Sequence, residues 1–389
     1  MHIMEKKTCF GVIPATRGFF NPAFAKGARK DIADLLDGLG YDCVMGSETD
    51  TPYGAVETLE HSRFYAKLFR ENADRIDGII VILPNFGDEL GVVQTIDLAK
   101  LDVPVLVQAC SDELGKFTVA ERRDSFCGKL SVMDVLCQNN VPFTALTPHV
   151  VHPCHKDFAA NLDYFARLCR VVRGMKSLTV GALGARTTAF KTVRVDEGTL
   201  QSHGITVETA DLSDIFRRAR GLDKNDRRLA TKADILKRYT SWIDVPPAAF
   251  ENLVRLAVTI DEVVEEMSLD AISIRCWLEI QQEFGISPCV ILSEMNDRGV
   301  PAACEVDTGS AIMMYALQKA SNNVAACLDW NNNYGEDPDK CILFHCGPVP
   351  RRMMVGQGAI SGHAILDTVL GPGRSYGCNT GRIAPSPFT

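Results

Sequence analysis

The sequence predicts an α/β protein made of two doubly wound units in tandem, followed by a small β-rich segment. In the first third of the 389-residue chain, apolar runs alternate with amphipathic stretches, and the same alternation starts again near residue 177. From about residue 345 glycine and proline become dense, which is typical of turns between short strands. A chain of this length exceeds one ordinary hydrophobic core, so two or three domains are expected.

In the first unit, strands and helices follow one another in a regular order. The apolar run "DGIIVILP" is typical of a parallel strand that is covered on both faces. The helix that starts near Asn21 has a capping residue there, Pro22 at its first position and Gly40 at its end. Strands are predicted at residues 9–15, 41–46, 77–84 and 103–109, and helices at 21–40, 55–74 and 161–177. This alternation is typical of a doubly wound sheet.

The second unit is predicted to begin at "SLTVGALG", so the boundary between the units falls near residue 175. Asp307 or Thr308 can cap a helix through "GSAIMMYALQKAS". "VAACL" is predicted to be a strand that ends at Asp329, "WNNNYGEDPDK" a polar loop, and "CILFH" a strand that ends at His345. The expected domains are therefore residues 1–175, 176–345 and 346–389.

Three residues in this second unit suggest a metal site. The predicted helix carries the chain away from Glu305 by roughly 21 Å, and the strand after it returns roughly 16 Å, so Asp329 can end near Glu305. Two carboxylates and the imidazole of His345 form an oxygen and nitrogen donor set that suits Mn²⁺ and its neighbours. A cation would also offset the repulsion between two neighbouring carboxylates.

Each of the three residues also has a purely structural interpretation. Glu305 precedes a helix, where the helix dipole favours a negative charge. Asp329 could be a turn residue at the end of a strand, and His345 could be an interior histidine with ordinary hydrogen bonds. The spacing by itself leaves both interpretations open.

Composition and charge argue against several other classes of protein. The formal net charge is −8, and the basic residues in "RRARGLDKNDRR" alternate with acids, so no nucleic-acid-binding face is predicted. No run approaches 18 consecutive apolar residues, so no membrane span is predicted. "MHIMEKKTCF" lacks the apolar core of a signal peptide, and most of the 14 cysteines lie in apolar runs. We therefore expect a cytoplasmic protein with reduced thiols.

The segment "RCWLEIQQEFGISPCVILSEMNDRGVPAACEVDTGSAIMMYAL", with "LDWNNNY", "FHCG" and the earlier "GVIPATRGFF", resembles the L-fucose and L-arabinose isomerase family. The resemblance is strongest over residues 274–347. It implies two Rossmann-like domains followed by a C-terminal β-barrel, and an enzyme that interconverts aldoses and ketoses with Mn²⁺. Because relatives continue through the barrel to a later histidine ligand, the barrel is expected to be incomplete in a sequence that stops at "APSPFT".

The resemblance also implies roles for individual residues. Glu305 and Asp329 correspond to the acidic ligands, which are also expected to shuttle protons, and His345 corresponds to a histidine ligand of the arabinose branch. Mg²⁺ or Co²⁺ could replace Mn²⁺. The family forms trimers or hexamers whose active sites are closed by a neighbouring subunit, so Arg17 is a candidate substrate contact in trans, although an ordinary loop arginine explains this residue at least as well. Trp330 could stack on the sugar and Asn331 could bind its hydroxyls, although core packing and turn formation explain these two residues equally well.

We consider three functions. The first is a metal-dependent sugar isomerase acting through an enediol, on L-fucose, L-arabinose or a modified, for example sulfonated, hexose. The second is a non-catalytic cytoplasmic sugar-binding protein. The third, an NAD-dependent oxidoreductase, would need a phosphate-binding G-x-G-x-x-G, which "GALGAR" does not supply. The histidines and cysteine of "HVVHPCH" fit no usual zinc spacing, so we predict an ordinary loop there.

Overall fold

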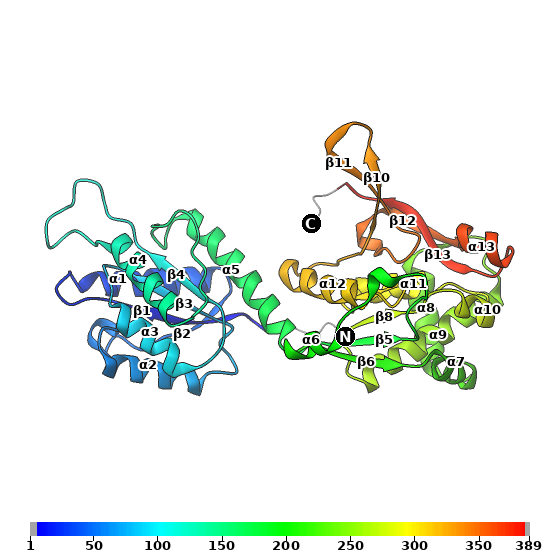
Figure 1. Cartoon of the computed structure of the whole chain (residues 1–389), viewed down its shortest axis with the longest axis horizontal. Coiled ribbons are helices and arrows are strands. Elements are labelled where there is room, and N and C mark those ends of the chain that lie inside the picture. The colour runs from blue at the N-terminus through cyan, green and yellow to red at the C-terminus, as the bar shows by residue number, and fades with distance from the viewer. Residues whose placement is uncertain (1–5, 386–389) are drawn as a thin grey trace. The chain divides into compact units, whose positions relative to one another are not determined.

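The computed structural model describes residues 6–385 and divides the chain into two compact units, Met1–Arg173 and Gly174–Thr389 (Figure 1). The first residues of "MHIMEKKTCF" and the last four of "APSPFT" lie outside the described range. Each unit is α/β and holds a four-stranded parallel sheet. Among the described residues, no helix combines the length and the apolar character that a membrane span requires.

The sheet of the first unit has the strand order β2-β1-β3-β4, and every neighbouring pair is parallel. The strands are β1 (Cys9–Pro14), β2 (Asp42–Val44), β3 (Gly78–Leu83) and β4 (Val105–Ala109). The helices are α1 (Ala23–Gly38), α2 (Leu59–Glu71), α3 (Glu89–Ala99), α4 (Ser125–Gln138) and α5 (Lys156–Met175), with a short 3₁₀ turn, η1, at Pro52–Gly54. This parallel, helix-covered sheet confirms the predicted α/β class.

Both faces of this sheet are buried, which explains the continuous apolar runs in its strands. In β3, Ile80 and Ile82 belong to the core on one face, while Ile79, Val81 and Leu83 belong to the core on the other. Alternate side chains of a strand point to opposite faces, so a strand covered by helices on both sides needs apolar residues at every position.

The parallel sheet of the second unit has the order β6-β5-β8-β9. Its strands are β5 (Thr179–Leu183), β6 (Thr206–Ala210), β8 (Ala271–Ile274) and β9 (Ala302–Ala303). The helices up to β9 are α6 (Glu197–Ser202), α7 (Leu212–Gly221), α8 (Arg227–Tyr239), α9 (Pro247–Glu266), α10 (Glu279–Phe284) and α11 (Cys289–Asp297), with a 3₁₀ turn, η2, at Lys191–Val193. Helix α12 (Thr308–Ser321) follows β9, and Asp307 caps it as predicted by accepting from Ser310 N at 2.9 Å.

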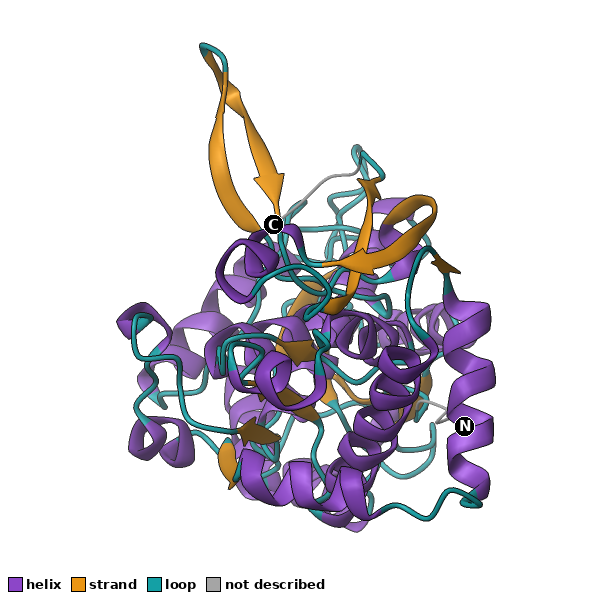
Figure 2. Cartoon of the chain, turned by 90° about the vertical axis from the view of Figure 1, so that its right-hand side faces the viewer, coloured by secondary structure: helices purple, strands orange, loops and turns teal. Residues whose placement is uncertain are grey.

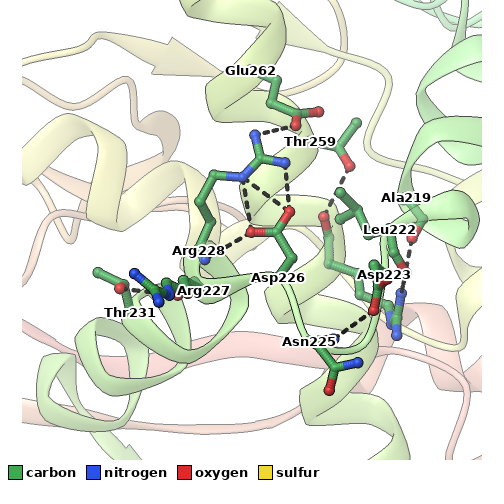
Figure 3. A network of polar contacts seen from close by, with 11 residues as sticks. Ala219, Leu222, Asp223, Asn225, Asp226, Arg227, Arg228, Thr231, Thr259 and Glu262 are labelled. Atoms are coloured by element: carbon green, nitrogen blue, oxygen red, sulfur yellow. Dashed lines mark hydrogen bonds and ion pairs between the residues drawn. The ribbon is translucent and has the colours of Figure 1, made fainter.

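The charged segment around residues 217–228 links α7, α8 and α9 by polar contacts (Figure 3). The Asp226 carboxylate caps α8 by accepting from Arg228 N at 2.9 Å, and Arg228 Nη2 donates back to it at 2.6 Å. The Arg228 guanidinium also pairs with Glu262 on α9. Four arginines of this segment are paired with acids within the unit: Arg217, Arg218, Arg220 and Arg228.

The chain after α12 differs from the prediction. "VAACL" forms no strand, and the segment predicted as a polar loop forms most of a hairpin of β10 (Asp329–Tyr334) and β11 (Asp337–Phe344), which projects from the second unit (Figure 2). The turn is Gly335-Glu336, with a positive φ of 60° at the glycine. Two-residue turns with glycine at φ > 0 match the twist of hairpin strands, and this turn signal outweighs the polarity of the strand residues.

The last part of the chain forms a three-stranded sheet of order β13-β12-β7. It contains β7 (Ser241–Trp242), β12 (Met354–Gly362), β13 (Tyr376–Ile383), the unpredicted helix α13 (Ala364–Leu370) and the 3₁₀ turn η3 (Arg351–Met353). Because β7 comes from the middle of the chain and Ile360 joins the main core of the unit, this segment packs as part of the second unit. The three-domain division and the β-barrel stay predictions.

Candidate functional site

The candidate site lies at the carboxyl ends of strands in the second unit. Cys276 comes two residues after β8, Cys304 and Glu305 come directly after β9, and His345 comes directly after β11. β8 and β9 are parallel neighbours, so their carboxyl ends meet at one edge of the sheet, where open α/β sheets bind ligands.

Four of these side chains line a cavity of about 280 Å³. Most of its wall is apolar or carries a thiol, and among its lining residues there is no lysine or arginine. The lining residues are Phe190, Cys276, Trp277, Leu278, Ser287, Cys289, Cys304, Glu305, His345, Cys346, Gly347, His363, Ile365, Leu366 and Val369. A cavity with few convergent polar groups in an apolar wall is typical of a small-molecule site.

Glu305 is a half-buried carboxyl group held in an unusual backbone conformation. Glu305 and Val306 both have positive φ, 65° and 56°, in a region that residues other than glycine rarely adopt. Strained residues of this kind cluster at functional sites, where the surrounding structure holds them. Trp277 Nε1 donates to Glu305 Oε1 at 3.4 Å, which orients the carboxyl group.

The electrostatic surroundings of Glu305 favour its protonated form. Burial raises the pKa of Glu305, and the negative charges of Asp329 and Asp307 raise it further, while the hydrogen bond from Trp277 lowers it. Burial disfavours the charged form because the low-dielectric interior solvates it poorly. A carboxyl group with a raised pKa is suited to both accepting and donating a proton near neutral pH.

His345 lies between Asp329 and Cys304. Its Nδ1 is 3.8 Å from Asp329 Oδ2, and its Nε2 is 3.3 Å from Cys304 Sγ. The side chain is only 6% exposed, and Nδ1 has no hydrogen-bond partner. Burial lowers the pKa of His345, although the charge of Asp329 opposes this, so the ring is neutral at neutral pH and its contact with Asp329 is no ion pair.

Gly347 allows the chain to pass over the imidazole of His345. A Cβ atom at Gly347 would lie 2.0 Å from His345 Nε2, a distance that no side chain could relieve without moving the ring. The glycine of the "HCG" motif is thus a packing requirement of the site.

The structure brings the three predicted ligands into one region without joining all of them. Asp329 reaches His345 because Asp329 pairs with Phe344 across the β10–β11 hairpin. Glu305 gathers instead with two thiols: the donor atoms of Cys276, Cys304 and Glu305 all lie within 4.8 Å of one another. Among residues 6–385, Glu305, Asp329 and His345 do not form such a group, and their metal-binding role stays a prediction.

The three predicted substrate contacts lie outside the cavity lining. Trp330 is 76% exposed on β10, and Asn331 beside it is also exposed. Arg17 lies in the first unit, where its guanidinium pairs with Glu89 and lies 3.6 Å from Asp88. Their substrate-binding roles stay predictions.

Several residues that line the site were missed in the sequence. Cys276, Cys304 and Trp277 looked like core residues because they stand in apolar surroundings, and only the pairing of β8 with β9 brings them to Glu305. His363 also lines the cavity, but its Nδ1 accepts from Leu366 N and its Nε2 lies 2.7 Å from the Cys346 carbonyl oxygen. Both ring nitrogens of His363 therefore already have partners, one at the start of α13 and the other at Cys346.

Comparison with known proteins finds sugar isomerases that are similar to this chain. Residues 11–176 match the model of the fucose/sulfoquinovose isomerase N-terminal domain. A sulfoquinovose isomerase from Alkalicoccus urumqiensis is 26% identical over 273 residues, which are 70% of this chain and 59% of that protein. One from Priestia aryabhattai is 22% identical over 338 residues, 86% of this chain and 72% of that protein. The chain thus spans about three fifths of the first of these relatives.

Among solved structures, an ABC transporter solute-binding protein from Agrobacterium vitis bound with alpha-D-tagatopyranose is 10% identical and covers 82% of this chain and 91% of its own. The TM-score of this match is 0.19. The isomerase matches confirm the predicted resemblance to the fucose isomerase-like family. The chain is therefore similar to the fucose isomerase-like family, and its residues 11–176 match the model of that family's N-terminal domain.

Proposed function

We propose that this chain catalyses the metal-assisted interconversion of an aldose and a ketose through an enediol. The observation that carries the proposal is Glu305, a strained, half-buried carboxyl group with a raised pKa that faces a cavity beside His345 and close to the charge of Asp329. The relatives named sulfoquinovose isomerase support the same chemistry.

The donor groups fit a divalent cation such as Mn²⁺. His345 Nδ1 is buried without a hydrogen-bond partner, and the charges of Glu305 and Asp329 act on one another. No lysine or arginine among the lining residues of the cavity compensates these carboxylates. Glu305, Asp329 and His345 would hold the ion, which when bound would polarise the sugar carbonyl. Mg²⁺ or Co²⁺ could replace Mn²⁺ at the same three side chains.

The residues of the chain divide the proton transfer between them. Glu305 would take the proton from the carbon next to the carbonyl and return it to the neighbouring carbon, because burial raises its pKa above that of an ordinary carboxyl group and so makes it a better proton acceptor. The Trp277 indole would hold the carboxyl group in place through its N–H. The apolar cavity wall would exclude water and strengthen these interactions. Asp329, at the solvent-facing side of His345, would exchange protons with solvent.

A sulfonated hexose is the substrate that the relatives favour. The cavity itself fits the reacting end of a sugar, since it has no cationic side chain for a sulfonate among its lining residues. The anionic end would therefore be bound outside this cavity, where Arg17 of the predicted trans contact is a candidate within a homo-trimer or homo-hexamer.

The test is an isomerisation assay of the chain with sulfoquinovose, L-fucose and L-arabinose, in the presence of Mn²⁺ and after exhaustive chelation. We expect turnover of the sulfonated sugar, its loss on chelation and its return when Mn²⁺ is added. Glu305→Gln should lower turnover by about 100-fold or more, the usual contribution of a general acid–base group.

Glu336→Gln is the matched control, because Glu336 is exposed in the hairpin turn and the same change should leave turnover unaltered. Proton exchange between the sugar and deuterated water separates catalysis from binding. If the chain binds a sugar but incorporates no deuterium into any of the three sugars, it is a sugar-binding protein, and the isomerase proposal is wrong.

A further inference from the structure

Two cysteines gather with the proposed catalytic carboxyl group, and nothing in the isomerase chemistry uses them. The Sγ atoms of Cys276 and Cys304 and a carboxyl oxygen of Glu305 all lie within 4.8 Å of one another. His345 Nε2 lies 3.3 Å from Cys304 Sγ, at the edge of this group of three donors. We propose that Cys276, Cys304, Glu305 and His345 form a binding site for a thiophilic divalent cation such as Zn²⁺.

The backbone presents these donors from a fixed framework. Cys276 and Cys304 follow β8 and β9, which are paired in parallel at Ile272 with Ala302 and at Ser273 with Ala303. The two thiols are 8% and 9% exposed, so packing holds them in place. Metal sites need donors that converge before the ion arrives, because ordering them on binding would cost affinity.

The histidine lies beside the thiols on one side of its ring. His345 is more than nine-tenths buried, and its Nε2 faces the Cys304 thiol. The ring nitrogen without a hydrogen-bond partner is Nδ1, which faces Asp329 on the other side of the ring, so the thiolate site would use Nε2 alone. The cavity of about 280 Å³ gives an ion access to the four side chains.

The donor chemistry selects the kind of cation. Two thiolates, one imidazole and one carboxylate match the tetrahedral sulfur and nitrogen sites that bind Zn²⁺, whereas Mg²⁺ and Mn²⁺ prefer oxygen donors. Each thiol gives up its proton to the solvent when its sulfur binds the ion, so at least two protons leave for each cation bound, and a protonated Glu305 releases one more. The indole of Trp277 donates to Glu305 and would fix the orientation of this ligand, as outer hydrogen bonds do in other metal sites.

The thiolate site shares Glu305 and His345 with the proposed isomerase site. A Zn²⁺ ion held there would withdraw both residues from the sugar, so a thiophilic cation should inhibit turnover. Cation binding itself does not depend on the isomerase proposal, and it is measured without a sugar.

The experiment is a titration of the whole chain with Co²⁺ under anaerobic, thiol-free conditions, followed by optical absorption. Co²⁺ bound by cysteine thiolates gives charge-transfer absorption in the near ultraviolet and intense visible bands when tetrahedral. We expect both signals at one equivalent, their loss on adding Zn²⁺, and their loss in Cys276→Ser and Cys304→Ser. A chain without thiolate absorption, or variants that keep it, would overturn the proposal.

The matched control is the other cluster of potential metal ligands among the described residues. It lies in the first unit and consists of Asp31, His152 and Cys154. Cys154→Ser should leave the cobalt signal unchanged; loss of the signal in this variant would place the ion there and overturn the proposal. A second measurement needs no variant. The chain is briefly and partially unfolded with and without Zn²⁺ and then alkylated, and the alkylated cysteines are identified by peptide mass spectrometry. Bound Zn²⁺ should protect Cys276 and Cys304 from alkylation. Equal alkylation with and without Zn²⁺ would also contradict the site.

Discussion

At the scale of single residues, Lys129 is a buried ammonium group in the first unit. Lys129 is only 2% exposed, and its Nζ donates to the His149 carbonyl oxygen at 2.9 Å. Burial lowers the pKa of Lys129 from 10.5 to about 8. The unfolded chain therefore binds more protons than the folded chain between these two values, so Lys129 makes the free energy of unfolding rise with pH across this window.

We expect Lys129→Met to remove this pH dependence. From pH 10.5 down to pH 8 the original protein should lose roughly 1–3 kcal/mol of stability relative to the variant, since one pKa unit corresponds to about 1.4 kcal/mol. Urea unfolding at several pH values measures the difference. Lys30→Met, at an exposed lysine, is the control, and parallel pH curves for the original protein and Lys129→Met would contradict the prediction.

At the scale of elements, Asp297 fastens the C-terminal segment to helix α11. Its carboxylate accepts from the Arg351 backbone N–H at 2.6 Å, from Arg352 Nε at 3.1 Å, and from the Tyr239 hydroxyl on α8. The carboxylate is largely buried, so losing it leaves the Tyr239 hydroxyl without its acceptor and leaves the Arg351 amide with only that hydroxyl oxygen as an acceptor, at 2.9 Å. This contact ties the beginning of β12 to the core of the second unit.

Asp297→Ala should therefore loosen the segment that begins at residue 351. We expect about 1–3 kcal/mol of destabilisation, the cost of unpaired buried polar groups, and faster proteolytic cleavage between β11 and β13. Asp339→Ala, in the exposed hairpin, should leave the cleavage pattern unchanged. Cleavage that is equally slow in Asp297→Ala and in the original protein would show that β12 is held by other contacts.

At the scale of the whole molecule, the hydrophobic cores divide between the two units. The cores on the two faces of the first sheet draw buried residues from positions 9–169, and those of the second unit draw them from 178–360, with no buried residue in common. Units with separate cores can unfold separately.

We expect calorimetry to resolve two transitions. Ile80→Ala, in a fully buried position of β3, should destabilise the first unit by about 2–5 kcal/mol and shift one transition. Leu253→Ala, buried in α9, should shift the other. A single transition that moves with both variants would show that the chain unfolds as one cooperative body.

Local patterns in the sequence determined much of this fold. Continuous apolar runs such as residues 78–83 predicted parallel strands, because every side chain of a strand covered on both faces must be apolar. The cap at Asp307 and the left-handed Asn322 at the end of α12 set the limits of that helix, because capping depends on near neighbours. The motifs of residues 274–347 also pointed to the isomerase family that the comparisons support.

Only the tertiary structure decided which side chains meet. The order of β8 and β9 in the sheet sets Cys276 beside Cys304 and Glu305, and the hairpin that replaces the predicted loop sets Asp329 beside His345. The pairing of β7 with β12 likewise joins positions more than 100 residues apart. Such contacts depend on long-range strand pairing and burial, which no local pattern specifies, and this is why the thiols around Glu305 became visible only in the folded chain.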